Sequence, residues 1–439
     1  MTKKRTTVKR IPLLVLVALC LFPLSVTAQE TAINQANTAW ILTATALVLF
    51  MTLPGLSLFY AGLVRSKNVL SVLMQCFAIA VVISILWLVV GYSIAFGPAE
   101  SAWWGGLSKA FFSGVVLDSM SGDIPETVFA SFQMTFAIIT PALIVGAFVE
   151  RIRFSAMLLF SVLWTLLVYF PVANWVWGGG WLAQRGLIDF AGGIVVHVTA
   201  GVAALVMALT LGQRRDFLSA AALPHNLTMS FTGAGMLWVG WFGFNAGSAL
   251  AADGAAGMAM FVTHISAATG ALTWMLLEWV KFGKPSGLGA ITGMVAGLAT
   301  ITPASGSVGP AGALIVGLCG GLGCYFATTY LKQGLRIDDS LDVFPVHGVG
   351  GIIGTLLAGI LVSANLGIFS GNGYAEGMTM ASQFLVQVLG VLATGLYTAV
   401  LTWLIIKLVS AVTGTLRVSN DDELQGLDIS DHDEKGYSL

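Results

Sequence analysis

Long apolar runs recur along most of this chain, and short polar segments separate them. The runs are about 20 residues long, the length at which an α-helix spans a bilayer. They predict an all-α polytopic membrane protein with eleven transmembrane helices, near residues 38–62, 68–96, 126–149, 154–176, 191–212, 226–250, 255–280, 286–306, 309–331, 344–365 and 380–410. Composition agrees, because 57% of the 439 residues are hydrophobic and only 9% are charged.

A separate apolar segment precedes these runs. Basic residues including Lys3 and Arg10 are followed by an apolar stretch from Ile11 to Leu24, and small residues then end at Ala28. This layout is typical of a cleavable secretory signal. The sequence therefore predicts a signal peptide at 1–28, a transmembrane domain at 29–417 and an acidic, polar tail at 418–439. A retained twelfth helix is the alternative, although the apolar stretch is short for a span.

Basic residues indicate the orientation of the helices, because short cytoplasmic loops collect lysine and arginine. After the predicted signal, thirteen basic residues follow odd-numbered helices, whereas only Lys109 and Arg185 lie on the other side. This asymmetry predicts that the mature N-terminus is outside and that the C-terminus is in the cytoplasm. Together with a signal peptide, it points to a multi-pass protein of a bacterial inner membrane.

Charge and cysteine content exclude several classes of function. A formal net charge of −1 gives no basis for nucleic-acid binding. One of the four cysteines, Cys20, lies in the predicted signal, and the other three lie in apolar runs. Neither a disulfide framework nor a metal-binding spacing is present. We therefore expect no metal and no cofactor.

Two histidines lie inside apolar runs, where ionisable side chains are costly and usually face a pathway or the protein interior. His197 follows Asp189, and His347 follows Asp342, with glycines close to each. If helices one to five and six to ten form two repeats, their odd number gives an inverted five-plus-five arrangement, with a final helix added. The histidines would then meet near a shared axis, either as a conduit that handles protons or as hydrogen-bonding contacts between helices.

Aromatic residues and a hydroxyl group suggest a cation site near the helix ends. The rings of Trp177, Phe132 and Phe136 could attract a small cation, and Ser248 could accept a hydrogen bond from an ammonium-type donor. An interfacial anchor is the alternative for Trp177. Phe136 and Phe244 would form a dry constriction.

The constriction favours a neutral guest, because a bare cation loses far more hydration there than a neutral amine does. Removal of a proton before passage would therefore help transport. Beyond the constriction, neutral imidazoles could hydrogen-bond the guest and relay a proton. Asp189 could bind a cation directly, but its place at the start of the fifth helix favours a structural role as a cap of backbone donors.

Five segments, in this order along the chain, resemble the ammonium transporter family of Amt, Mep and Rh proteins, and in particular its bacterial Amt branch. They are residues 58–68, 146–154, 189–193, 240–248 and 342–348. The resemblance implies a homotrimer with a pore in each subunit, ammonium or methylammonium as substrate, and no enzymatic activity.

The resemblance also implies roles for individual residues. The outer ammonium site matches Trp177, Phe136 and Ser248, with Phe132 close by, and the phenylalanine gate matches Phe136 and Phe244. The twin pore histidines match His197 and His347, and the supporting carboxylate matches Asp189.

The tail resembles the Amt pattern in residues 423–428 and 432–437. In relatives this segment docks beneath the pores and helps a PII-type signalling protein to plug them, which implies a regulatory tail. Asp433 departs from the family pattern, which has glycine at this position. An ammonium sensor of the same fold, signalling through its tail, is the alternative function. An intramembrane enzyme using a histidine with Ser248 or Ser131 has no nucleophile motif to support it.

Overall fold

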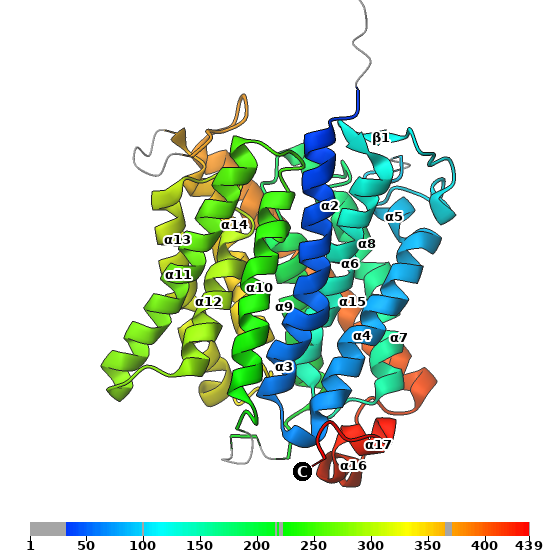
Figure 1. Ribbon diagram of the computed structural model, residues 1–439, viewed down its shortest axis with the longest axis vertical. Helices are drawn as coiled ribbons and strands as arrows, with labels where there is room; N and C mark the ends of the chain where they lie inside the picture. Colours follow the sequence, from blue (N-terminus) through cyan, green and yellow to red (C-terminus); the bar gives the residue numbers. More distant parts are fainter. Residues whose placement is uncertain (1–31, 99–100, 216, 219–222, 365–370, 439) are drawn as a thin grey trace, which may run out of the picture.

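Long helices run side by side through the molecule and form a single bundle (Figure 1). The computed structural model describes residues 32–438 apart from 99–100, 216, 219–222 and 365–370. The predicted signal peptide at 1–28 lies outside the described residues.

The first part of the bundle contains the helices up to residue 211 and one short hairpin. Its elements are α2 (Gln35–Phe50), η1 (Met51–Leu56), α3 (Ser57–Leu63), η2 (Ser66–Asn68), α4 (Val69–Leu86), η3 (Trp87–Gly91), α5 (Tyr92–Phe96), η4 (Ala110–Phe112), β1 (Met120–Ser121), β2 (Ile124–Pro125), α6 (Glu126–Phe148), α7 (Phe154–Trp164), η5 (Thr165–Tyr169), α8 (Phe170–Val176), η6 (Ala183–Arg185), η7 (Gly193–Val198) and α9 (Thr199–Leu211). The strands β1 and β2 pair antiparallel.

The second part contains the remaining long helices and two short ones near the C-terminus. Its elements are α10 (Leu227–Gly247), α11 (Gly254–Phe282), α12 (Gly287–Ile301), α13 (Pro310–Thr329), η9 (Tyr330–Gly334), η10 (Phe344–Gly348), α14 (Val349–Leu361), α15 (Met380–Thr413), α16 (Asn420–Gln425) and α17 (Leu427–His432). The eighth helix was expected to reach residue 306, but α12 ends at Ile301. Pro303 follows closely and has no N–H with which to continue the helical hydrogen bonds.

The chain is a multi-pass membrane protein by the length and hydropathy of its helices. Among the described residues, nine helical segments are long and apolar enough to cross a membrane: 35–63, 66–96, 126–148, 154–176, 193–211, 254–282, 310–334, 344–361 and 380–413. Helix α12 is also apolar but is shorter than these nine segments. The expected polytopic fold is therefore confirmed as mostly helical, whereas the eleven helices, the inverted repeat and the orientation stay predictions.

The two ends of the bundle differ. One end, which we call the N-terminal face, carries the start of α2 and the β1–β2 hairpin, because the Asn37 side chain donates to Asp123 at 2.7 Å. The end of α10 lies at the same face, since the backbone N–H of Ala252 donates to Asn37 Oδ1 at 2.8 Å. The opposite end, the C-terminal face, carries α16 and α17 (Figure 1).

Glycines allow the two histidine-bearing segments to approach closely. A methyl group added at Gly201 of α9 would lie 2.3 Å from Cα of Gly348, and one added at Gly351 of α14 would lie 2.7 Å from the carbonyl oxygen of Gly193. Neither distance is possible for a real side chain. Small residues of this kind let membrane helices pack backbone to backbone, so α9 lies against η10 and α14 lies against η7.

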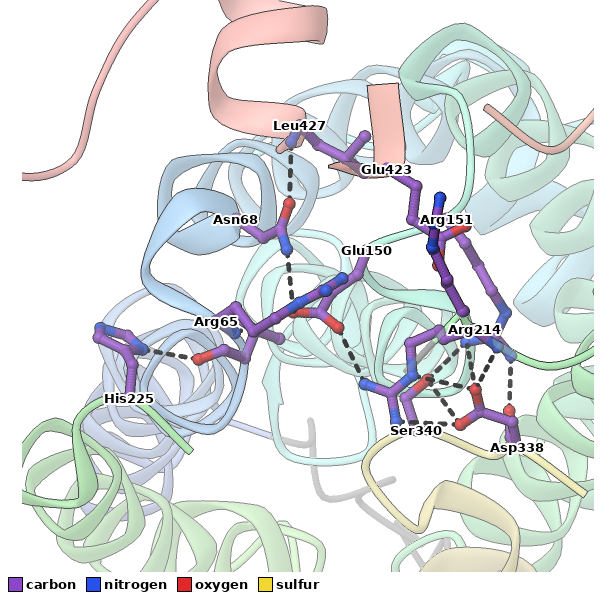
Figure 2. A network of polar contacts seen from close by, with 12 residues as sticks. Arg65, Asn68, Glu150, Arg151, Arg214, His225, Asp338, Ser340, Glu423 and Leu427 are labelled. Carbon is purple, nitrogen blue, oxygen red and sulfur yellow. Dashed lines mark hydrogen bonds and ion pairs between the residues drawn. The ribbon is translucent and has the colours of Figure 1, made fainter. Parts of the chain in front are cut away.

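A network of ion pairs connects the loops at the C-terminal face, and Figure 2 shows its main members. Glu150 accepts from Arg65 Nε at 3.0 Å and pairs with Arg214 at 3.0 Å. Arg214 also pairs with Asp338 at 3.0 Å. The fully buried Arg151 donates to Ser340 at 2.5 Å and to backbone oxygens of neighbouring residues. Buried charges are thus matched by partners of opposite charge or by carbonyl dipoles, as burial requires.

Burial and neighbouring charges set the pKa values in this network. Burial by itself would raise the pKa of Glu150, but the guanidinium groups of Arg214 and Arg65 hold it below the ordinary value of 4.5. Burial lowers the pKa of Arg151 to about 10. Glu150 is therefore a carboxylate and Arg151 is protonated at neutral pH.

The tail packs against this network. The backbone N–H of Leu427 donates to Asn68 Oδ1 at 2.8 Å, and Asn68 Nδ2 in turn donates to Glu150 at 2.9 Å (Figure 2). Asp428 accepts from the backbone N–H of Ser71 at 2.8 Å. The tail is therefore hydrogen-bonded to η2 and to the first turn of α4, and through Asn68 it is connected to Glu150.

Asp433 lies at the end of α17 in a left-handed conformation, with φ 53° and ψ 32°. Glycine adopts this conformation without strain, and aspartate is one of the few other residues that tolerate it. The substitution noted in the sequence is thus compatible with a docked tail.

The Glu150→Gln variant should be clearly less stable, because it leaves two partly buried guanidinium groups with less than their full counter-charge. We expect a loss on the order of 3 kcal/mol at pH 7, measured as a lower midpoint of thermal unfolding in detergent. The folded-state pKa of Glu150 is below 4.5, so its contribution is present above that pH and is lost as the pH falls through the folded-state pKa. The difference in unfolding midpoint between this variant and the wild type should therefore shrink as the pH is lowered.

Glu376→Gln is the matched control, because Glu376 is exposed at a loop. It should leave the midpoint unchanged. An equal effect of the two variants would show that the paired carboxylate does not stabilise the fold.

Candidate functional site

A pocket of about 260 Å³ lies toward the N-terminal face and is lined mainly by aromatic rings. We call it the aromatic pocket. Its walls come from the ends of α5, α8 and α10, from α6 and from the loop before η7: Phe96, Phe129, Gln133, Phe136, Val176, Trp177, Phe190, Ser248 and Leu250. Three residues expected at a cation site, Trp177, Phe136 and Ser248, are thereby brought together from different helices.

Hydrogen bonds fix the polar groups of Trp177 and Ser248. The indole N–H of Trp177 donates to the backbone oxygen of Asp189 at 2.9 Å. The Ser248 hydroxyl donates to the backbone oxygen of Phe244 at 2.8 Å. Because their protons are used in this way, what the indole can offer a cation is its π face, and the hydroxyl oxygen keeps lone pairs with which to accept.

A column of rings continues from the aromatic pocket into the bundle. The ring centroids of Trp177 and Phe136 are 5.7 Å apart, and those of Phe136 and Phe244 are 4.4 Å apart. Phe136 and Phe244 are 1% and 0% exposed, so both rings are almost completely buried within the bundle. Phe132 lies beside Phe136, edge to face at 5.0 Å, and supports it from α6.

The two histidines lie immediately beyond the phenylalanines. The His197 ring stacks on Phe244 at 6.1 Å and on Trp241 at 5.5 Å. Nδ1 of His197 and Nδ1 of His347 are 3.2 Å apart, within hydrogen-bonding distance. Both side chains are buried. The arrangement thus joins residues that are far apart in the sequence into one pair.

A hydrogen bond between two Nδ1 atoms restricts the protonation of the pair. One ring must donate and the other must accept, so at least one Nδ1 is without a proton. In a neutral pair, one ring then has a free acceptor at Nε2 and the other has a free donor. His197 Nε2 is buried without a hydrogen-bond partner among the described residues. A donor and an acceptor are therefore available to a small guest molecule.

Asp189 fixes the turn that carries His197. Its Oδ1 accepts from the backbone N–H groups of Gly192 and Gly193 at 2.9 and 2.5 Å. Its Oδ2 accepts from those of Ile194 and Val195 at 2.8 and 3.0 Å. These are donors that a helix start leaves without partners, so the side chain caps η7 and its oxygens are occupied by the protein's own backbone.

Gly192 is needed beside this cap. Its φ of 115° is unfavourable for residues with a side chain, and an added methyl group would lie 2.6 Å from Val196 and 3.3 Å from Trp177. Gly192 therefore serves the cap and the aromatic pocket at once.

The described residues hold no group of three or more histidine, cysteine, aspartate or glutamate side chains suited to a metal ion. The chemistry of the site consists of π faces, one hydroxyl, one carboxamide and two imidazoles. Such groups can attract a cation, hydrogen-bond it and exchange a proton.

Sequence reasoning missed Gln133, Phe129 and Trp241. Gln133 was inside the segment that supplied Phe132 and Phe136, and Phe129 lies one helical turn before it. The i, i+3 and i+4 spacing on a helix would have placed Phe129, Gln133 and Phe136 on one face. Trp241 precedes Phe244 by three residues and so shares its helix face, but its contact with His197 joins two helices that are distant in the sequence.

Comparison with known proteins accounts for this combination of features. The sequence matches the Ammonium Transporter Family over residues 39–437. The chain belongs to the ammonium transporter family. Its matched relatives are named as transporters, which agrees with the prediction that it is not an enzyme.

Relatives of this transporter-family chain match it over nearly their full length. An ammonium transporter of Aquifex aeolicus is 46% identical over 414 residues, which cover 94% of this chain and 96% of that protein. The crystal structure of Saccharomyces cerevisiae Mep2 gives a TM-score of 0.81 at 37% identity, covering 89% of this chain and 91% of that one. A structure described as a sensor Amt protein gives a TM-score of 0.83 at 28% identity, covering 90% and 98%.

The Asp189→Asn variant should lose much of the cap. An amide has only one acceptor oxygen, and its NH₂ group would face two backbone donors. We expect a loss on the order of 3 kcal/mol, seen as a lower midpoint of thermal unfolding.

Asp253→Asn is the matched control, because Asp253 caps α11 by accepting from two backbone N–H groups with a single oxygen. Asparagine is an equally good residue at such a helix start. The control should be nearly neutral, and similar midpoints for both variants would contradict the role assigned to the second oxygen of Asp189.

Proposed function

We propose that this protein transports ammonium across the membrane by binding the cation in the aromatic pocket, removing one proton and conducting ammonia past the histidine pair. The observation that carries the proposal is the continuous order of groups from Trp177 through Phe136 and Phe244 to His197 and His347. Along this order the first groups can attract a cation, the next are apolar, and the last can exchange a proton.

The aromatic pocket suits a small cation with N–H donors. The faces of Trp177 and Phe136 attract positive charge, and Ser248 has an oxygen free to accept a hydrogen bond. Ammonium and methylammonium meet these requirements.

The phenylalanine pair favours ammonia over ammonium at the next step. Both rings are almost completely buried, and a phenyl ring has no oxygen with which to replace the water around a charge. A neutral molecule loses only hydrogen bonds there, and it regains some at the imidazoles. The proton then either returns to the side from which it came or follows through the histidine pair.

The proposed topology has eleven spans, with α10 and α12 crossing in addition to the nine long apolar segments. The N-terminal face is outside and the C-terminal face is cytoplasmic, because the basic side chains Arg65, Arg151 and Arg214 lie together at the C-terminal face. The same orientation puts the aromatic pocket outside, as uptake requires. The proposed location is a bacterial inner membrane, reached by means of a signal peptide at 1–28.

The proposed assembly is a homotrimer, as the family resemblance implies, with a lipid bilayer around it. The tail at 418–439 is proposed to be regulatory, with a PII-type protein as its partner at the cytoplasmic face. Its hydrogen bonds to Asn68 and Ser71 support this role, because they connect it to the start of the span at 66–96.

A sensor function is the second candidate. It is supported by the likeness to a structure described as a sensor Amt protein. Transport is favoured, because relatives with higher identity are named as ammonium transporters.

The test of the proposed function is an ammonium pulse applied to proteoliposomes of the purified protein on a solid-supported membrane. A saturable current specific to ammonium and methylammonium is expected if net charge moves. A faster shift of internal pH than in protein-free vesicles, without current, would indicate electroneutral conduction. If neither the current nor the pH shift appears, transport is refuted and the sensor function is favoured.

The Trp177→Leu variant should bind ammonium more weakly, because leucine has no π face. A loss of about 1–2 kcal/mol corresponds to a roughly 5- to 30-fold higher half-saturating concentration. Trp104→Leu is the control, since Trp104 is 38% exposed and lies in a different groove. Equal half-saturation in the wild type and both variants would exclude cation binding by the indole.

The His197→Ala and His347→Ala variants should keep the fold but change proton coupling or selectivity, because each removes one partner of the imidazole pair. The current per ammonia molecule transported is the quantity to measure. His264→Ala is the control, since His264 is exposed on α11 and packs on Trp238 away from the column. Unchanged current and selectivity in both pore variants would remove the histidines from the mechanism.

A further inference from the structure

Gln133 of α6 carries a carboxamide with no hydrogen bond to the described part of the chain. The residue is 8% exposed, and its Oε1 has no hydrogen-bond partner among the described residues. A buried amide oxygen left in this way destabilises the fold, so it needs an explanation. Gln133 also lines the aromatic pocket, which supplies one.

The position of Gln133 on α6 is set by the helix. Phe129 precedes it by four residues, Phe136 follows it by three, and both rings line the same pocket. Residues at these spacings share one face of a helix. The carboxamide is therefore held between two aromatic rings on the pocket wall.

The other polar groups of the aromatic pocket have already used their protons. The indole N–H of Trp177 donates to Asp189 O, and the Ser248 hydroxyl donates to Phe244 O. What they offer a ligand is a π face and an accepting oxygen. The pocket is thus matched to a ligand that donates several hydrogen bonds and accepts none.

The carboxamide of Gln133 is free to turn its oxygen toward such a ligand. Neither amide atom is hydrogen-bonded within the described part of the chain, so no contact fixes one of its two orientations. Oxygen and nitrogen exchange places by rotation about the terminal bond of the side chain.

We propose that Gln133 is a specificity-determining residue of the aromatic pocket, whose side-chain oxygen accepts a hydrogen bond from bound ammonium alongside Ser248 and favours ammonium over methylammonium. This inference rests on the proposed function and deepens it. Gln133 acts on binding at the pocket and takes no part in the proton exchange at the histidines.

The preference follows from the number of donors. Ammonium has four N–H groups, so that two can be accepted by Ser248 and Gln133 while the others face rings. Methylammonium has three N–H groups and one methyl group, which is satisfied by apolar surface. An apolar side chain at position 133 would therefore leave an N–H of ammonium without an acceptor, but it would accommodate the methyl group.

The test compares half-saturating concentrations of ammonium and methylammonium in proteoliposomes for the wild type and three variants. Gln133→Leu should raise the half-saturating ammonium concentration about tenfold and that of methylammonium much less, so the preference for ammonium falls. Gln133→Glu keeps accepting oxygens and should keep the preference. Gln75→Leu is the matched control, because Gln75 is a fully buried glutamine with an unpartnered Oε1, and it lies on α4 outside the aromatic pocket.

Two outcomes would overturn the inference. One is an unchanged ratio of the two half-saturating concentrations in Gln133→Leu, and the other is an equal change of that ratio in Gln75→Leu. If Gln133→Leu does not fold, Gln133→Asn applies the same test, because it withdraws the oxygen by one methylene. It should lower the half-saturating concentration of methylammonium divided by that of ammonium, as Gln133→Leu should.

The experiment distinguishes failure of this inference from failure of the proposed function. If the wild type gives no saturable ammonium signal, the proposed function fails and the inference falls with it. If the wild type responds to ammonium and the ratio is the same in all Gln133 variants, only the role of Gln133 is refuted.

Discussion

The carboxylate of Asp189 is the interaction on which the rest of the site depends. It accepts from the backbone N–H groups of four consecutive residues and so determines where the turn with His197 begins. Its backbone oxygen holds the indole of Trp177. One residue therefore connects the orientation of the aromatic pocket to the position of the histidines, although these groups serve different steps of the proposed transport.

The hydrogen bonding of buried polar groups matters along the proposed path as it does in the rest of the bundle. Within the bundle, polar groups are costly unless they are hydrogen-bonded, and most of them are bonded to helix carbonyls or to one another. Among the buried side-chain atoms that lack a hydrogen-bond partner within the described residues, Oε1 of Gln133 and Nε2 of His197 occur along the proposed path. Such a group is available to a guest molecule because it lines the path, whereas Gln75, whose Oε1 is also unpartnered, is fully buried outside the aromatic pocket.

Charges gather instead at the C-terminal face, where loops and tail meet. Glu150 pairs with Arg65 and Arg214, and Asn68 bonds both Glu150 and the tail. A displaced tail would change the hydrogen bonds of a residue that also contacts the ion-pair network. This arrangement gives the proposed regulatory role a physical route from the tail to loops between the spans.

The sequence by itself determined the class of fold, because apolar runs of bilayer length admit only helices. It also identified the family, since its five motifs lie in fixed order. The individual residues Trp177, His197 and His347 were singled out from their unusual surroundings. Tertiary structure decided which of them meet, because the Nδ1 contact joins side chains that are 150 residues apart. It also revealed Trp241 and Gln133, whose roles depend on contacts between helices and on what remains without a hydrogen bond. No local pattern encodes such relations, since they arise only when separate helices pack.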